Sequence, residues 1–404
     1  MASSSSLYLL SFFFTIVLAF ISVSSKPPKL HAFIFPIRRD EETHQFYTEL
    51  DIGTPTNNIY VVIDLGGQFS WLDCDQYNSS TYRHVRCSSP KCKATIGGDG
   101  ANCIDCKEKP HRPGCTRNTC ALSSYNPKTD MYIVGGVGED TMGVSFTDGN
   151  VYVDDEVMRR FTFGCGVKGL LSGLAKPTKG ILGLGRAPIS LSTQLSSAFK
   201  LVHNKFALCL PSSTEIYLGT MFVGRGPFYF INYTGDSSTL LNIKTPLVIN
   251  PVGHSRPPLN SKDFSSRDYF LDVKGIKALV GDFVKEAAAK KMKRVGSVAP
   301  FGACFSSENI KNTMTGPAVP IIDLVFKGNN APWRIYGANS MVKVKKNVLC
   351  LGFVDGGSTP TTSIILGGYQ LENNFLEFDL ESSVVGFSST LLLHNASCSQ
   401  TRLF

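Results

Sequence analysis

The chain has 404 residues, a formal net charge of +8, 18% charged residues, 37 glycines and 12 cysteines. This composition argues against an intrinsically disordered chain. The length suggests two packed domains, because a chain of this size exceeds what a single hydrophobic core usually organises. The positive charge favours contact with polyanions, but no basic cluster interleaved with aromatic residues indicates a nucleic-acid-binding surface.

Residues 1–25 have the pattern of a secretory signal peptide. They contain no acidic or basic side chain, and the apolar, hydroxyl-rich run Leu7–Val23 ends in the small residues Ser24 and Ser25. The positively charged n-region is missing, so an uncleaved membrane anchor is the alternative. No later segment approaches 18 consecutive apolar residues. We therefore expect a secreted, extracellular chain with no membrane contact after cleavage.

Short strand-like runs dominate the rest of the chain and are separated by Gly, Pro, Asn and Ser clusters, which is typical of an all-β protein of sandwiches or barrels. The predicted strands are Phe46–Ile52, Ile59–Asp64, Met142–Phe146, Phe161–Gly164, Phe206–Leu210, Ile216–Leu218 and Phe375–Leu380. Helical signals are few. One helix is predicted at Asp282–Arg294, with Asp282 as its cap and basic residues in its last turn, and a short one at Leu191–Leu195.

All the cysteines follow the signal segment: Cys74, Cys87, Cys92, Cys103, Cys106, Cys115, Cys120, Cys165, Cys209, Cys304, Cys350 and Cys398. An even number in a secreted chain predicts up to six disulfides. The Cys103-x-x-Cys106 pair could also suggest zinc, but His84 and His111 do not form a second ligand pair at finger spacing. We expect no metal and no cofactor. Three sequons, at Asn78, Asn232 and Asn395, predict N-glycosylation.

Several strings resemble pepsin-fold aspartic proteases of the plant nepenthesin type. They are Tyr47–Pro55, Phe163–Gly166, the GILGLGRAPIS string Gly180–Ser190, and Phe378–Leu380 with Val385–Phe387. Two more, Ser297–Phe305 and Trp333–Met341, resemble the catalytically inactive branch of that family: xylanase inhibitors, xyloglucan-endoglucanase inhibitors, extracellular dermal glycoprotein and basic globulins. The resemblance covers nearly the whole mature chain.

This resemblance implies an all-β, bilobal pepsin-like fold with few short helices. The implied lobes are 26–205, with a Cys-rich insertion at 74–120, and 206–404. The family pattern also implies disulfides Cys74–Cys165, Cys209–Cys398 and Cys304–Cys350, with the other six cysteines stapling the insertion between Cys87 and Cys120.

Proteolysis by this family needs two carboxylates that share one proton, and the sequence offers only one. Asp64 stands at the first position of the family's Asp-Thr-Gly signature, but Leu65 replaces the threonine. We interpret Asp64 as a vestigial loop residue that accepts backbone N–H bonds. The second motif should lie between Tyr269–Val273 and the predicted helix, where neither Asp-Thr-Gly nor Asp-Ser-Gly occurs. Asp355-Gly356-Gly357 is only superficially similar. The C-terminal lobe therefore looks internally truncated and the catalytic dyad incomplete.

The resemblance instead implies a defence-related inhibitor that pushes a loop into the cleft of a microbial glycoside hydrolase, where two catalytic carboxylates lie close together. In relatives that inhibit family 11 xylanases, a histidine four residues before the last cysteine reaches those carboxylates, and His394 matches that position. Relatives that act on family 12 xyloglucanases use an arginine three residues before it, where this chain has Asn395. A glycan on Asn395 would crowd the insertion of His394.

Other interpretations of the sequence stay open. His394 can be an ordinary surface residue, and the chain can be a binding or storage protein like the seed basic globulins, or a truncated product without function. The net charge of +8 also favours acidic cell-wall polysaccharide such as pectin as a partner. The densest basic cluster is Lys285, Lys290, Lys291, Lys293 and Arg294, which can equally be a solvated helix face.

Overall fold

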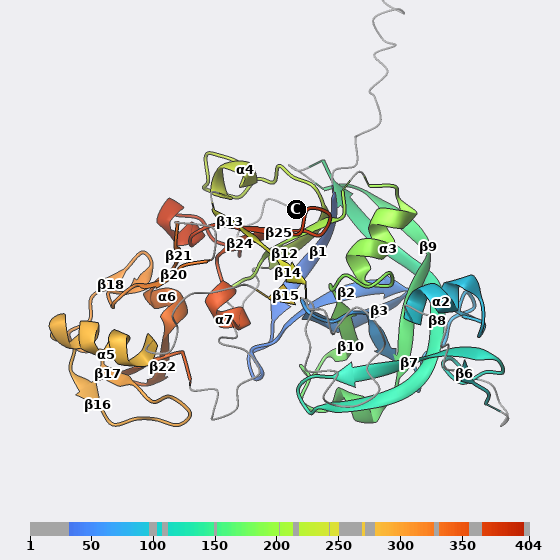
Figure 1. Cartoon of the computed structure of the whole chain (residues 1–404), viewed down its shortest axis with the longest axis horizontal. Helices are drawn as coiled ribbons and strands as arrows, with labels where there is room; N and C mark the ends of the chain where they lie inside the picture. The colour runs from blue at the N-terminus through green and yellow to red at the C-terminus, as the bar shows by residue number, and fades with distance from the viewer. Residues whose placement is uncertain are drawn as a thin grey trace, which may run out of the picture. The chain divides into compact units, whose positions relative to one another are not determined.

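A computed structural model describes residues 32–96, 103–106, 112–148, 152–201, 203–212, 218–241, 243–249, 269–270, 279–326, 331–354 and 366–399 (Figure 1). The predicted signal peptide, most of the predicted strand Ile216–Leu218, residues 274–278 of the segment 274–281 in which the second catalytic motif was expected, and Asp355-Gly356-Gly357 lie outside the described residues.

The N-terminal half is built almost entirely from strands. They are β1 (Ala32–Arg39), β2 (Phe46–Ile52), β3 (Asn57–Asp64), β4 (Trp71–Asp73), β5 (Arg83–His84), β6 (Cys103–Ile104), β7 (Thr119–Asn126), β8 (Met131–Thr147), β9 (Tyr152–Gly166) and β10 (Thr178–Gly183). Its helices are α2 (Pro90–Ile96), the 3-10 helix η1 (Lys168–Leu171) and α3 (Leu191–Ala198).

The C-terminal half contains shorter strands: β11 (Lys205–Cys209), β12 (Gly219–Gly224), β13 (Ile243–Pro246), β14 (Val248–Ile249), β15 (Tyr269–Phe270), β16 (Arg294–Val295), β17 (Cys304–Ser306), β18 (Asn312–Thr313), β19 (Gly316–Pro317), β20 (Ile322–Leu324), β21 (Trp333–Ile335), β22 (Met341–Lys345), β23 (Val348–Leu351), β24 (Phe375–Asp379) and β25 (Val384–Phe387). Its helices are α4 (Ser237–Leu240), α5 (Leu279–Ala289), α6 (Gly337–Ser340), α7 (Gly368–Leu371) and the 3-10 helix η4 (Leu391–His394). The predicted all-β class is confirmed.

One large sheet connects elements from both halves in the order β13-β25-β24-β11-β12-β1-β2-β3-β10-β4-β9-β8-β7-β6. At its middle, β12 pairs with β1 through Met221 and Phe35, and β11 pairs with β24 through Phe206 and Phe378. The last two rings stack with centroids 4.7 Å apart. The lobe boundary predicted at 205/206 falls inside β11, directly after its first residue Lys205, and β11 pairs with β24 in the C-terminal half.

The predicted strand Phe46–Ile52 matches β2 residue for residue, and its buried and open positions alternate as a half-buried strand requires. The helix predicted at Asp282–Arg294 is wrong at both ends. The helix in the structure, α5, begins at Leu279, so Asp282 lies in its first turn rather than at its cap, and α5 ends at Ala289. Lys291 adopts a left-handed conformation with φ 57°, and Arg294 pairs with Phe305 in a sheet. The left-handed turn at Lys291 thus ends the helix, and strand pairing takes up Arg294 at the end of the basic run.

Six disulfides join all twelve cysteines, and no cysteine is free. Cys74–Cys165, Cys209–Cys398 and Cys304–Cys350 are the three pairs that the resemblance implied. Within the insertion the pairs are Cys87–Cys103, Cys92–Cys120 and Cys106–Cys115. Cys103 and Cys106 therefore belong to two different bridges. Within the described ranges, no helix combines the length and apolar character needed to cross a membrane.

Candidate functional site

Asp64 lies where two parallel strands end together. It closes β3, and β10 runs beside it with Gly183 as the partner of Asp64 in the register. The N–H of Leu184 donates to the Asp64 carbonyl at 3.0 Å, and the N–H of Gly66 donates to the carboxylate Oδ1 at 3.2 Å. The side chain is half-buried. Its carboxylate thus accepts a backbone N–H bond, as the sequence interpretation expected.

Glycines allow the two loops around Asp64 to approach closely. A Cβ on Gly183 would stand 2.5 Å from the Phe69 carbonyl oxygen and 2.6 Å from that of Gly67, which is too close for any side chain. The N–H of Gly183 donates to the Ser70 hydroxyl at 3.2 Å. The loop is therefore fixed by main-chain contacts, with Leu65 in the place of the signature threonine.

The C-terminal loop that carries His394 has a buried base and an exposed tip. Leu391, Ala396 and Cys398 are at most 2% exposed and belong to one core cluster, whereas Leu393 is 41% exposed and His394 is also exposed. Thr390 caps the short helix η4 by accepting a bond from the Leu392 N–H at 3.4 Å. The geometry presents the histidine outward from a fixed turn.

Asn373 ties the two ends of this loop together. Its side-chain Oδ1 accepts a bond from the Cys398 N–H at 3.1 Å, and its carbonyl accepts one from the Leu391 N–H at 2.7 Å. Asn373 is 3% exposed and adopts a left-handed backbone with φ 54°. The Cys209–Cys398 disulfide adds a covalent tie to β11. These contacts limit the conformational entropy that the loop would lose on docking.

An aromatic neighbour orients His394. The Tyr233 ring meets the imidazole edge to face, with centroids 5.1 Å apart and planes at 74°. The Tyr233 hydroxyl lies 2.8 Å from the Thr239 hydroxyl, and Tyr233 also packs against the core cluster under the loop. The imidazole therefore has a defined resting position at the surface. The structure places it after β25, whereas Asp64 ends β3, so the two predicted site residues belong to different elements.

The three predicted glycosylation positions are all exposed. Asn232 and Asn395 have left-handed backbones, with φ of 63° and 53°, at turns of the chain. Asn395 directly follows His394 as the C-cap of η4. A glycan at this position would stand next to the imidazole.

A buried ion pair not anticipated from the sequence connects the central sheet to the loop region. Arg39 Nε on β1 lies 2.9 Å from Glu372 Oε1, with the two side chains 15% and 5% exposed. Burial raises the pKa of Glu372 to about 7, and the positive charge of Arg39 opposes part of that rise. Glu372 immediately precedes Asn373, so its protonation state acts close to the base of the C-terminal loop.

Sequence reasoning also missed a groove in the N-terminal half, with a volume of about 690 Å³, lined by several arginines. Two of them, Arg83 and Arg86, are only three residues apart, and this spacing was the one signal available in the sequence. The others come from distant segments and could not have been grouped without the fold.

Family models described as "xylanase inhibitor N-terminal" and "xylanase inhibitor C-terminal" match residues 46–225 and 269–389. A probable aspartic proteinase GIP2 from Nicotiana benthamiana is 42% identical over 409 residues, which cover 90% of each chain. The alignment is 409 positions long, which is more than the 404 residues of this chain, although it covers only 90% of them. The relative therefore has residues in the aligned region that this chain lacks. Gamma conglutin 1 from Prunus dulcis is 35% identical over 96% of this chain and 95% of that protein.

Solved structures agree with these relatives. The crystal structure of edgp has a TM-score of 0.85 at 38% identity and covers 93% of this chain and 98% of that chain. Conglutin gamma, a basic 7S globulin from lupine seeds, has a TM-score of 0.79 at 30% identity, with 93% and 100% coverage. An aspartic proteinase from Irpex lacteus, at 13% identity and a TM-score of 0.50, shares the fold, covering 88% of this chain and 97% of that chain.

Proposed function

Because the chain belongs to the inactive, pepsin-like plant family with xylanase-inhibitor-type N-terminal and C-terminal domains, we propose that it is a secreted inhibitor of microbial glycoside hydrolases. The observation that carries the proposal is the exposed His394 on a loop whose base is buried and covalently tied. A preorganised donor of this kind suits a cleft with two catalytic carboxylates.

The proposal includes the absence of proteolysis. A paired-aspartate mechanism needs one carboxylate as base and one as acid, since like charges at close range force their pKa values apart. Asp64 supplies one carboxylate, and the sequence from Lys274 to Asp282 supplies no Asp-Thr-Gly or Asp-Ser-Gly for the second. Digestion of haemoglobin at acidic pH, abolished by an aspartic-protease inhibitor, would contradict this part of the proposal.

Inhibition is tested by titrating the purified protein against a family 11 xylanase and a family 12 xyloglucanase. We expect inhibition of the xylanase, lost at least tenfold in His394→Ala, because His394 occupies the histidine position and Asn395 replaces the arginine. His203→Ala, which removes a half-buried histidine paired with Glu381 far from the loop in sequence, is the matched control and keeps full potency. No loss of hydrolysis at micromolar excess would overturn the proposal.

The sequon at Asn395 needs its own control. Ser397→Ala removes the glycosylation signal while leaving Asn395 in its left-handed cap conformation. If a glycan crowds the loop, this variant inhibits more strongly than the glycosylated protein. Equal potency would mean that the sugar, when present, points away from the docking surface.

A storage or binding role is the second candidate, and the specific observation in its favour is the match to seed proteins. A basic 7S globulin from Glycine max is 33% identical over 94% of this chain and 94% of that protein. Abundance in seed protein bodies, without inhibition of either hydrolase, would favour this role. Location in the apoplast or cell wall, with binding to acidic polysaccharide there, would favour the inhibitor.

The internal shortening of the C-terminal lobe belongs to the proposal and is tested separately. Sequencing the transcript across the codons for Val273–Val284 would show either the same short segment or additional codons. A longer transcript would restore a complete second lobe and remove the third possibility, a truncated product without function.

A further inference from the structure

The groove in the N-terminal half lies among segments that the disulfides hold in place. It is formed by the segment around β5, the start of α2, residues 112–116, and the strands β8 and β9, and its volume is about 690 Å³. Volumes of about 300–1,000 Å³ are typical of small-molecule sites. Its size therefore suits a short oligomeric ligand.

Positive charge dominates the lining. Its cations are Arg83, Arg86, Lys91, Arg112 and Arg160, and Glu139 is the only acidic residue among the lining residues that the structure describes. The charge of Glu139 is already neutralised, because Lys91 Nζ lies 2.5 Å from its Oε1. Arg112 also has a partner, since its Nη1 lies 2.9 Å from Oδ1 of Asp75, which does not line the groove.

Three guanidinium groups keep their charge available. Arg83, Arg86 and Arg160 are exposed and form no ion pair within the described part of the chain. Arginine presents several donors in a planar fork that matches a carboxylate with two parallel hydrogen bonds. The groove thus offers carboxylate-binding groups from the segment around β5 and from β9.

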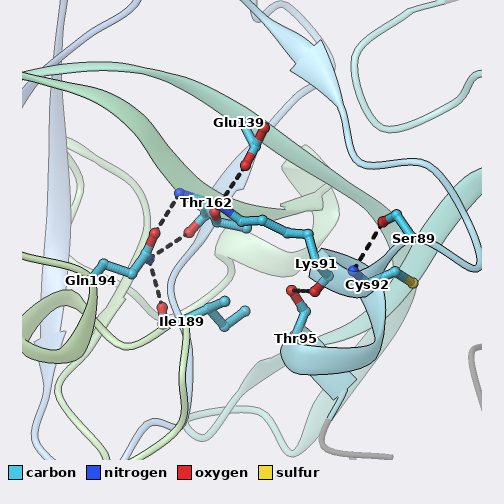
Figure 2. A network of polar contacts seen from close by, with 8 residues as sticks. All are labelled: Ser89, Lys91, Cys92, Thr95, Glu139, Thr162, Ile189 and Gln194. Carbon is cyan, nitrogen blue, oxygen red and sulfur yellow. Dashed lines mark hydrogen bonds and ion pairs between the residues drawn. The ribbon is translucent and has the colours of Figure 1, made fainter. Parts of the chain in front are cut away.

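The walls are rigid before any ligand binds. Figure 2 shows Lys91 reaching from α2 toward Glu139 on β8, while the Ser89 hydroxyl accepts a bond from the Cys92 N–H at 3.1 Å. The Cys92–Cys120 disulfide fastens α2 to β7. Next to Glu139 on β8, a Cβ on Gly138 would stand 2.3 Å from the Tyr82 ring, so strand and ring are in close contact. Little ordering entropy remains to be lost on binding.

Neutral hydrogen-bonding groups stand among the cations. Asn78, Ser79, Ser89 and Thr116 contribute amide and hydroxyl groups to the lining. A compact inorganic anion would need the charge but not this spread of neutral groups, whereas a sugar chain presents hydroxyls between its carboxylates. We propose that this groove binds an acidic oligosaccharide with a carboxylate on each sugar, an oligouronate. The site lies in the N-terminal half and does not depend on the inhibition of hydrolases by the C-terminal loop.

Calorimetric titration with tetragalacturonate tests the assignment, using full-length protein in which Ser80→Ala removes the sequon of Asn78 at the groove. We expect binding that weakens as salt rises, no binding of a neutral xylotetraose, and much weaker binding of inorganic sulfate. Arg86→Gln with Arg160→Gln should weaken tetragalacturonate binding at least tenfold. The matched control, Lys290→Gln with Lys293→Gln, removes the same charge from two exposed positions just after α5 and should leave binding within twofold.

Each outcome decides the proposal. Equal weakening in both double variants would show a non-specific charge effect and overturn it. Sulfate binding as tight as the oligosaccharide would overturn the assignment of a uronate chain, and absence of binding would overturn the site. Because xylanase inhibition is measured with the same preparations, failure of the groove and failure of the C-terminal loop are distinguishable.

Discussion

Asn373→Ala should destabilise the base of the C-terminal loop more than the small change in side-chain size suggests. The substitution removes the Oδ1 that accepts from the buried Cys398 N–H, which costs about 1–3 kcal/mol when the donor stays unpaired. It also places alanine at φ 54°, where a non-glycine residue without a short polar side chain costs about 1–2 kcal/mol. The expected loss of unfolding free energy is therefore about 2–5 kcal/mol.

Guanidinium unfolding followed by tryptophan fluorescence provides the assay. Trp333 is a local reporter, because its Nε1 donates to Asn374 Oδ1 at 3.2 Å, one residue from the substitution. Asn373→Gly is the control: it also loses the acceptor but accepts the left-handed backbone, so it should be more stable than Asn373→Ala by about 1 kcal/mol. If both variants unfold within 0.5 kcal/mol of the natural protein, a value about the size of ordinary surface substitutions, the reasoning is refuted.

Three further predictions concern the pH dependence of stability, a buried hydrogen bond and helix propensity. Glu372→Gln should flatten the fall in stability as pH rises from about 4.5 to 7. In the folded state Glu372 keeps a proton over this range that the unfolded state releases, so the unfolding free energy of the natural protein falls by up to about 3 kcal/mol as pH rises. Denaturant unfolding at several pH values measures this fall. A pH profile unchanged by the substitution would contradict this. Tyr77→Phe removes a 2.7 Å bond to the buried Asp140 carboxylate and should cost about 1.5–3 kcal/mol in denaturant unfolding, although Thr81 still donates to that carboxylate; an unchanged midpoint would show that the bond is not needed. Gly281→Ala, with open space around the added methyl group, should raise stability by about 0.5–1 kcal/mol, and a lower thermal midpoint would show that α5 is not limited by propensity.

Local alternation was enough to predict the strands with one buried face. In Phe46–Ile52 the buried residues recur at every second position, and the prediction reproduced β2. For β8 the prediction found only Met142–Phe146 of the seventeen residues. Its first part contains Gly135 and Gly138, which lower strand propensity but are needed here. A Cβ on Gly135 would stand 1.8 Å from the Cys165 carbonyl oxygen, a contact that only the folded sheet creates.

The candidate sites also differ in whether a short stretch of sequence identifies them. His394 could be identified because its place relative to Cys398 lies within one short segment, and Asp64 because its motif is local. The groove could not, because Arg83 and Arg160 are brought together only by pairing of β5 with β8 and of β8 with β9, and Arg112 comes from a separate segment. The Arg39–Glu372 pair joins residues 333 positions apart and has no local signature.

The mode of inhibition tests the central claim most directly. If His394 enters the substrate cleft, inhibitor and substrate exclude one another, so steady-state kinetics of a family 11 xylanase should show a rising apparent KM and an unchanged kcat. With His394→Ala, the same rise in apparent KM should need at least tenfold more of the protein. A fall in kcat at constant KM, or equal inhibition by His394→Ala, would contradict the account.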